Sequence, residues 1–314
     1  MAKVLLIIAI IIILGGIGYF LYTNYFKSPT GGSPSTAQST VLQAQWQEGG
    51  VAIAGKYADA DLVDLGAGKW RMYYSVEPEV PGNKLELYSS TSNDGITWTQ
   101  EEGVRKEFAT FPSVIKLADG KYRLYFQNAG VIKSALSDDG LTWTDEPGTR
   151  IEAAEEGLSD IENVGAHSVI ELSDGTFLMV YRVMVKERYS QDVPNDSTQI
   201  LYYAISKDGL TWEKRGLAAD SRNETFQGLI DGAELVKWQV EIRLYFWSYK
   251  GIYHLVFEND IFSQEPDFDF TNNKDPNLKF APNPPGDPTL GKIQEKWFMY
   301  YGQHEKGIYY ATLE

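Results

Sequence analysis

The sequence predicts an all-β domain that follows a single N-terminal transmembrane helix. Three observations support this class. The chain opens with a long apolar segment that carries no charge. From Val41 onward, short alternating runs rich in Val, Ile, Tyr, Phe and Trp recur between turns of Gly, Asp and Asn, without long helical periodicity. Two sequence phrases also recur several times, so the strands are expected to form repeated units.

The N-terminal segment predicts an uncleaved signal anchor. Val4–Tyr22 contains no charge and is long enough to cross a ~30 Å hydrocarbon layer as a helix. A buried helix of a soluble domain is the alternative, but such helices rarely run this long without a polar residue. The apolar run ends in bulky residues rather than at a small-x-small cleavage site, so residues 1–27 are expected to stay as a transmembrane helix.

The segment that follows predicts a linker and a separate domain. Residues 28–41 are rich in Ser, Thr, Gly and Pro, which is typical of a flexible spacer. Residues 42–314 then form the β domain. The very short tail before the apolar segment favours an extracytoplasmic location for this domain.

The first repeated phrase predicts five hairpins. It consists of a small or acidic residue, an apolar pair, a Gly-containing turn and a strand that ends in aromatic residues. Its copies begin 52 to 66 residues apart, at 59–75, 111–127, 167–182, 233–248 and 287–302. Self-similarity of this period, with about four strands per unit, predicts a five-bladed β-propeller. The last unit is one strand short, so the segment around Trp46–Ile53 is expected to supply its outer strand and close the ring.

The second phrase, Ser-x-Asp-Gly-x-Thr-Trp, predicts structural turns. It occurs at 92–98, 137–143 and 206–212. The Asp side chain can accept backbone N–H groups, the Gly can adopt a left-handed conformation and the Trp can pack between blades. Three copies at equivalent outer positions cannot line one site on the propeller axis. We therefore assign this phrase to architecture rather than to chemistry.

The composition limits the classes of function. The chain has 314 residues, no cysteine and a formal net charge of −15 at pH 7. Without cysteine there are no disulfides, thiolate metal sites or cysteine nucleophile. The negative charge disfavours nucleic acid, because a polyanion would be repelled. No HExxH, GxSxG or phosphate-cradling glycine motif is present in the sequence, which argues against zinc hydrolysis, α/β-hydrolase catalysis and nucleotide chemistry.

The hairpins and the S-x-DG-x-x-W turns resemble the five-bladed propeller superfamily of glycoside hydrolase families 43 and 32 and their relatives. The turns also resemble the Asp-boxes of sialidases, but they lack the residue that those motifs carry between Asp and Gly, and sialidases have six blades. The resemblance covers residues 42–314. It implies a glycosidase-like site in which three acidic residues surround a sugar: a base or nucleophile on the first blade, an orienting Asp on the second and a Glu acid on the third or beyond.

Carried over position by position, the resemblance implies a catalytic set. Asp59 matches the first-blade base, although Ala60 stands where Pro is usual. Phe111 occupies the position of the orienting Asp, so the second-blade acid is missing. Glu162 or Glu234 is expected to donate the proton. The alternatives are a carboxylate that caps strand ends for Asp59, and a solvated loop acid or a strand-end acid for the two glutamates.

A second group of residues is expected to bind the substrate. His167 is one of three histidines and lies at an inner-strand position, and an ordinary hydrogen-bonded histidine is the alternative. Arg182 has the chemistry to bind a carboxylate-bearing sugar, with a blade-to-blade ion pair as the alternative. Trp247 has the chemistry to stack on a sugar face, with packing between blades as the alternative. The full predicted set is His167, Arg182, Asp231, Trp247, Asp287 and Phe111.

No cofactor or metal is predicted. Loops 191–198 and 272–277 carry oxygen ligands, but neither has the spacing of a calcium loop, so a structural calcium ion has no support. The predicted partners are a carbohydrate and, through residues 1–27, a membrane. Three functions remain open: a surface-anchored glycosidase-like enzyme, a non-catalytic propeller that binds a glycan or a protein, and an assembly scaffold whose funnel is plugged.

Overall fold

The computed structural model describes residues 45–78, 80–275 and 277–313, and in this part of the chain the strands form five antiparallel sheets. The first blade contains β2 (Tyr57–Gly66), β3 (Lys69–Val76), β4 (Glu86–Ser92), β5 (Thr99–Gln100) and β6 (Lys106–Glu107). The second contains β7 (Thr110–Lys116), β8 (Tyr122–Asn128), β9 (Val131–Ser137) and β10 (Thr144–Asp145). The third contains β11 (Ile161–Glu171), β12 (Phe177–Val185), β13 (Thr198–Ser206) and β14 (Trp212–Ala219).

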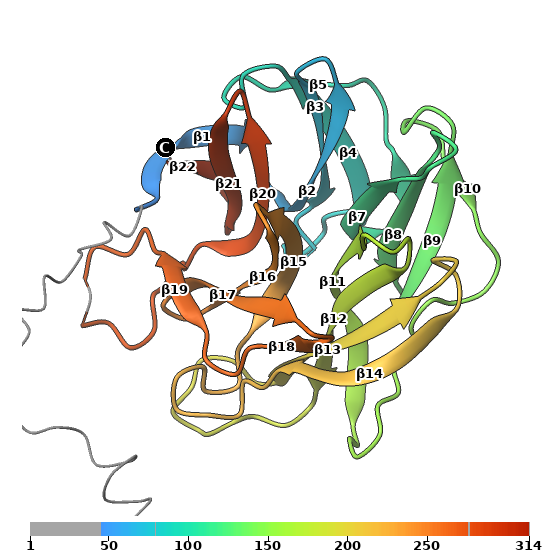
Figure 1. Cartoon of the computed structure of the whole chain (residues 1–314). Helices are drawn as coiled ribbons and strands as arrows, with labels where there is room; N and C mark the ends of the chain where they lie inside the picture. Colours follow the sequence, from blue (N-terminus) through green and yellow to red (C-terminus); the bar gives the residue numbers. More distant parts are fainter. Residues whose placement is uncertain (1–44, 79, 276, 314) are drawn as a thin grey trace, which may run out of the picture. The chain divides into compact units, whose positions relative to one another are not determined.

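The last two blades complete the ring. The fourth contains β15 (Asp231–Trp238), β16 (Glu241–Ser248), β17 (Gly251–Glu258), β18 (Ile261–Phe262) and β19 (Asp267–Phe270). The fifth contains β20 (Gly286–Ile293), β21 (Lys296–Gln303), β22 (Gly307–Leu313) and β1 (Gln47–Ala54). Because β1 pairs with β22, the N-terminal strand closes the last sheet, as the sequence predicted. Figure 1 shows this strand beside the C-terminal strands.

The inner strands β2, β7, β11, β15 and β20 form the hub. Each contacts the inner strand of the blades on both sides, and β20 contacts β2, so the ring is closed (Figure 1). Five clusters of buried apolar side chains fill the spaces between neighbouring blades. The predicted five-bladed β-propeller is therefore confirmed.

The turns between the first two strands of each blade differ from the prediction in two cases. The first three hairpins turn on Gly68, Gly120 and Gly175, all with positive φ. The fourth and fifth contain no Gly at this point: Gln239 adopts φ 55°, and residues 294 and 295 also have positive φ. The expectation of a Gly-containing turn in every copy is thus wrong for these hairpins, whose turns are made by residues that bear side chains.

The Ser-x-Asp-Gly-x-Thr-Trp turns hold neighbouring blades together. Asp139 Oδ1 accepts the backbone N–H groups of residues 141 and 142 at 2.7 and 2.8 Å, and Gly140 adopts φ 71°. The Tyr73 hydroxyl of the first blade donates to the Gly140 carbonyl at 2.7 Å, and Trp143 meets the Tyr73 ring edge-on. The other two copies make the same contacts with Tyr300 and Tyr125. The assignment of this phrase to architecture is confirmed.

The predicted anchor and linker, residues 1–41, lie outside the described residues. Within the part of the chain that is described, no helix is long and apolar enough to cross a membrane.

Candidate active site at the hub

A bulge at the start of each inner strand directs side chains toward the axis. The pairing register with the second strand shifts at this point in all five blades. A residue with positive φ stands at the equivalent position each time, and such bulges re-aim the side chain that they carry. These residues are Asp59 (φ 53°), Phe111 (49°), Ala166 (41°), Gly232 (64°) and Asp287 (44°).

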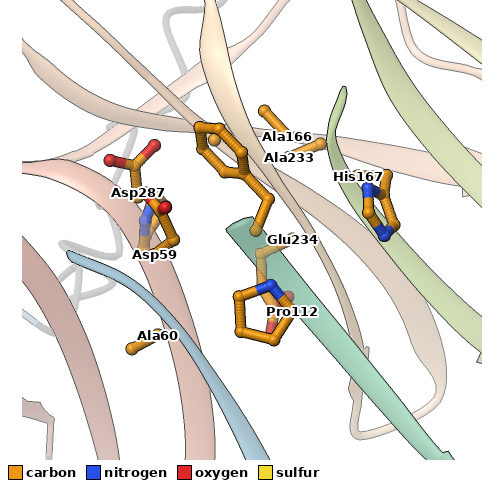
Figure 2. Close-up of a pocket in the computed structure, with 11 residues that line it drawn as sticks. Asp59, Ala60, Pro112, Ala166, His167, Ala233, Glu234 and Asp287 are labelled. Carbon is orange, nitrogen blue, oxygen red and sulfur yellow. The ribbon is translucent and has the colours of Figure 1, made fainter. Parts of the chain in front are cut away.

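The bulges surround a narrow axial pocket of about 20 Å³, which is room for about one water molecule. Asp59, Phe111, His167, Glu234 and Asp287 all line it. Figure 2 shows Asp59 and Asp287 on the left of the pocket and His167 on the right. The structure thus brings together five of the nine predicted site residues around one point on the axis.

A wider cleft of about 170 Å³ lies beside the axial pocket. Asp59, Phe111 and Asp287 line both the axial pocket and the cleft, so the two spaces share part of their walls. Asp231 and Trp247, from the fourth blade, line the cleft but not the axial pocket. Its remaining walls come from the ends of β2, β20 and β21 and from loops at the same face of the propeller, where the inner strands begin.

Asp59 and Asp287 lie at matching positions of neighbouring strands. Strands β2 and β20 contact each other, and both aspartates stand at the positive-φ residue of the bulge. Asp59 is 5% exposed. The Trp247 indole N–H donates to Asp287 Oδ1 at 3.1 Å, which fixes the orientation of the indole at the cleft wall. The cleft therefore presents two carboxylates next to an aromatic ring.

Arg182 forms a buried ion pair with Asp231. Its Nη1 donates to Asp231 Oδ2 at 2.7 Å and its Nη2 to Asn163 Oδ1 at 2.8 Å. The guanidinium also lies 5.6 Å from the centre of the Phe111 ring. Both charged side chains are largely buried, with side-chain exposures of 5% and 9%. This geometry corresponds to the blade-to-blade ion pair, and it links the third blade to the fourth.

Glu234 lies beneath the cleft and joins three strands. The hydroxyls of Ser168 and Thr289 donate to its two carboxyl oxygens at 3.0 and 2.8 Å. Burial raises the pKa of Glu234 to about 7. The pKa of Asp61, at the equivalent position of β2, is also raised, by its own burial and then by the charge of Glu234. Glu234 lines the axial pocket and does not line the cleft.

The residues equivalent to Glu234 form a hydrogen-bonded belt around the hub. Asp61 accepts the backbone N–H of Val114 in the next blade at 2.9 Å. Ser113 accepts from residue 169 and Ser168 from residue 235, at 3.0 and 2.9 Å. Each polar side chain thus satisfies a backbone donor of the following inner strand, which a hub of purely apolar side chains would leave unpaired.

The other predicted residues are placed as follows. His167 is buried in the axial pocket, and burial lowers its pKa to about 4, so that its ring is neutral at neutral pH. Glu162 is exposed on β11 and lines neither the axial pocket nor the cleft. Tyr249, which follows Trp247 by two residues, is buried against Phe280.

Among the cleft residues that were not predicted from the sequence, two are titratable and contact each other. Glu77 follows β3 and His304 follows β21, and both line the cleft. Glu77 is buried, its Oε1 is hydrogen-bonded to His304 Nδ1, and its Oε2 accepts the N–H of Glu305 at 2.9 Å. A signal existed, because the turn after each second strand returns to the face where the inner strands begin. Acidic residues and histidines in these turns were therefore candidates.

Metal ligands do not gather at this site. Within residues 45–78, 80–275 and 277–313, no group of three or more His, Cys, Asp or Glu side chains has a geometry that would hold a metal ion.

Comparisons with known proteins identify the fold class. No protein-family model matches the sequence, and no curated protein matches it. Solved structures do match. One described as a glycoside hydrolase has a TM-score of 0.63 and 15% identity, over 86% of this chain and 92% of the other. A thermostable family-43 glycoside hydrolase has a TM-score of 0.58 and 16% identity, over 85% and 92%.

A third structure comes from a compost microbial metagenome. It is CoXyl43, a GH43 β-xylosidase/α-arabinofuranosidase in complex with xylotriose, in a calcium-free form. Its TM-score is 0.59 and its identity 15%, over 85% of this chain and 94% of the other. This chain therefore has the five-bladed fold of family-43 glycoside hydrolases and related proteins, as the sequence resemblance predicted. At these identities the likeness concerns the fold alone.

Proposed function

We propose that this protein binds the end of an oligo- or polysaccharide in the cleft and hydrolyses a glycosidic bond there. One observation carries the proposal: Asp59 and Asp287 stand at matching bulges of neighbouring inner strands, and both line the axial pocket and the cleft. Glycoside hydrolysis needs carboxylates around the sugar, because water must be activated and positive charge at the anomeric carbon stabilised. The similar structures that are described as glycoside hydrolases, one of them with bound xylotriose, support this choice.

The roles follow from position. Asp59 is the carboxylate that activates the attacking water. Asp287 stabilises the positive charge that develops on the sugar and holds the Trp247 indole through its hydrogen bond. Trp247 offers an aromatic face on which a sugar ring stacks. Neither predicted proton donor lines the cleft: Glu162 lines neither space, and Glu234 lines only the axial pocket.

The charge of the cleft favours neutral sugars. Four carboxylates line it, on Asp59, Glu77, Asp231 and Asp287. Arg182 forms an ion pair with Asp231. A uronic acid would bring another negative charge into this environment and be repelled. We therefore expect turnover of neutral glycosides and none of galacturonides.

A non-catalytic glycan-binding propeller is the second candidate. The observation that favours it is Phe111, which takes the bulge position of the second blade where the resemblance expects an orienting acid. The cleft, at about 170 Å³, is also smaller than the 300–1,000 Å³ typical of small-molecule sites, which suits one sugar ring.

Substitution of Asp59 separates the two candidates. The full chain and its Asp59→Asn variant would be assayed on 4-nitrophenyl glycosides of xylose, arabinose, galactose, glucose and galacturonic acid. We expect Asp59→Asn to lower kcat by on the order of 10³-fold, the scale of a lost general base. Asp61→Asn is the matched control, because Asp61 is a buried carboxylate on the same strand that lines neither space. Its kcat should stay within a few-fold of wild type.

The outcomes are distinct. Equal kcat for wild type and Asp59→Asn would remove Asp59 from the reaction. No turnover of any glycoside, together with saturable binding of a sugar in calorimetry, would establish the binding propeller instead.

We further propose that residues 1–27 anchor the protein in a membrane, with the propeller on the extracytoplasmic side. The uncharged segment Val4–Tyr22 supports this proposal. The test is fractionation of cells that express the full chain, followed by protease treatment of intact cells. A soluble propeller, or one that resists protease until the cells are lysed, would contradict it.

A further inference from the structure

The cleft contains a carboxylate–imidazole pair to which the proposed hydrolysis has so far given no role. The Glu77 carboxylate is buried and receives two donors, the His304 ring and the N–H of Glu305. The His304 side chain is itself 53% exposed and lines the cleft together with Asp59 and Asp287. The backbone of His304 is also held, since its N–H donates to Asn283 Oδ1 at 3.2 Å.

This pair has the arrangement of an oriented proton-transfer group. A carboxylate oxygen only accepts, so Glu77 places a hydrogen on Nδ1 and leaves Nε2 to gain or lose a proton. Histidine is the side chain whose ordinary titration falls nearest neutral pH. Glu77 is buried and holds the ring at its Nδ1 atom. Because the His304 side chain is exposed, solvent can exchange a proton with the ring.

The other two histidines differ in a decisive respect. His167 is buried in the axial pocket, where its pKa is lowered to about 4. His254 is bonded to Asp269 at 2.7 Å, a second carboxylate–imidazole pair, but it is buried within the fourth blade and lines no part of the cleft. Only His304 combines a buried carboxylate partner with access to the cleft among the three.

We propose that His304 is the catalytic proton donor of the site and that Glu77 is its positioning residue. This inference rests on the proposed hydrolysis and supplies the donor that Glu162 and Glu234 do not. His304 lines the same cleft as Asp59 and Trp247, so it belongs to the walls around a sugar bound there.

The protons balance through one turnover. The Nε2–H of the imidazolium passes its proton to the glycosidic oxygen as the bond between that oxygen and the anomeric carbon breaks, and the leaving group departs as an alcohol. A water molecule attacks the anomeric carbon and gives one proton to Asp59. His304 then takes a proton from solvent and Asp59 releases one. The net reaction is hydrolysis.

Acidic side chains from several strands share the cleft with His304. These are Glu77 after β3, Asp59 on β2, Asp287 on β20 and Asp231 on β15, of which Asp231 is ion-paired with Arg182. Lys306, two residues further along the chain, is exposed and does not line the cleft.

The experiment uses leaving groups of different acidity. A 2,4-dinitrophenolate leaves without help from an acid, whereas phenolate needs a proton. The full chain and His304→Gln would be compared on 2,4-dinitrophenyl and phenyl glycosides of the sugar that the wild type cleaves. We expect His304→Gln to lose on the order of 10²–10³-fold in kcat/KM on the phenyl glycoside and less than about 10-fold on the dinitrophenyl glycoside. The alkaline fall in the wild-type pH–rate profile should disappear in the variant.

Two further variants guard against a purely structural effect. Glu77→Gln should show the same dependence on the leaving group with a smaller loss, because it removes the positioning carboxylate and keeps the imidazole. His254→Gln is the matched control, since it breaks a carboxylate–imidazole pair outside the cleft. It should affect both substrates equally or not at all.

The inference is overturned if His304→Gln leaves both rates unchanged, or lowers both by the same factor. If Asp287→Asn shows the dependence on the leaving group instead, Asp287 is the donor. If the wild type cleaves neither glycoside, the proposed hydrolysis fails and this inference fails with it, an outcome distinct from an active wild type with an equally active His304→Gln.

Discussion

The outer turns and the hub bulges are both repeated elements. In the outer turns the side-chain contacts repeat, whereas in the hub bulges only the backbone conformation repeats. In the three outer turns the contacts are the same: an Asp that accepts two backbone N–H groups, a Gly with positive φ, and a Trp against a Tyr of the neighbouring blade. At the five hub bulges the backbone is the same but the side chains are not. The positions carry Asp59, Phe111, Ala166, Gly232 and Asp287.

The difference reflects the task. Every interface between blades must be packed, so the same set of packing contacts can be used at several interfaces. The hub has one cleft, and each wall of it needs a different group. Similar side chains at equivalent positions thus indicate architecture, whereas a repeated backbone with divergent side chains indicates a site. Three measurements test this division.

The largest effect on stability is expected from an outer turn. Trp143 meets the Tyr73 ring edge-on and packs between the first two blades. Trp143→Ala removes this packing, and we expect the free energy of unfolding to fall by about 3 kcal/mol. The kcat of the folded protein should not change. Urea denaturation and glycoside assays measure the two quantities, and a loss of kcat without a loss of stability would break the division.

Trp247 provides the comparison, because its indole is bonded to Asp287 at the cleft wall. Trp247→Phe should raise KM several-fold with a smaller loss of stability, since an aromatic side chain remains. Matching profiles for Trp143→Ala and Trp247→Phe would show that the two regions do not differ in kind.

An intermediate effect on stability is expected in the hydrogen-bonded belt around the hub, where the Glu234 carboxyl makes the stability depend on pH. The pKa of Glu234 is raised to about 7 in the folded protein, against 4.5 as its ordinary value. The folded state therefore favours the protonated carboxyl. This contribution is fully present below about pH 4.5 and is lost as the pH rises through 7, a loss of about 2 kcal/mol between pH 5 and 8.

Glu234→Gln tests the belt, because glutamine does not titrate. Its free energy of unfolding should depend less steeply on pH between 5 and 8 than that of the wild type. Since Asp61 carries a raised pKa next to Glu234, some slope should remain in the variant. Identical slopes, measured by urea denaturation at each pH, would show that Glu234 does not carry the effect.

The fold was predictable because its signals are local. Alternating apolar residues, turn residues and the period of the hairpins determine strands and blades, and a last unit with three strands requires a partner such as Trp46–Ile53. The positions of Asp59 and Asp287 were found because they begin the repeated hairpin. They lie on neighbouring strands because closure of the ring brings β20 next to β2.

The rest of the site depends on features that do not repeat. A one-residue bulge reverses the alternation of side chains, so the sequence did not indicate that Glu234 points beneath the cleft. Glu77 and His304 lie in turns after the second strands, and their meeting depends on how far each turn reaches toward the axis. The lengths and paths of such turns differ from blade to blade.

The smallest effect on the free energy of unfolding is expected at the turn of the fourth hairpin, where the residue with positive φ is not glycine. Gln239 is exposed and adopts φ 55°, whereas the first three hairpins use Gly at their turns. Glycine has no Cβ, so it adopts this conformation without the cost of roughly 1–2 kcal/mol that other residues incur. Part of that gain is offset by the greater freedom of glycine in the unfolded chain. We expect Gln239→Gly to raise the free energy of unfolding by about 0.5 kcal/mol.

Val240, the next residue, is the control for this last prediction. It is fully exposed and has no positive φ, so Val240→Gly should lower stability by a similar amount. Opposite signs for the two variants would show that conformation, not composition, sets the effect. A loss for Gln239→Gly would mean that the Gln side chain stabilises the turn. Asp59 adopts the same positive φ with a side chain, and Asp59→Gly should abolish hydrolysis, because it removes the carboxylate that the proposed reaction requires.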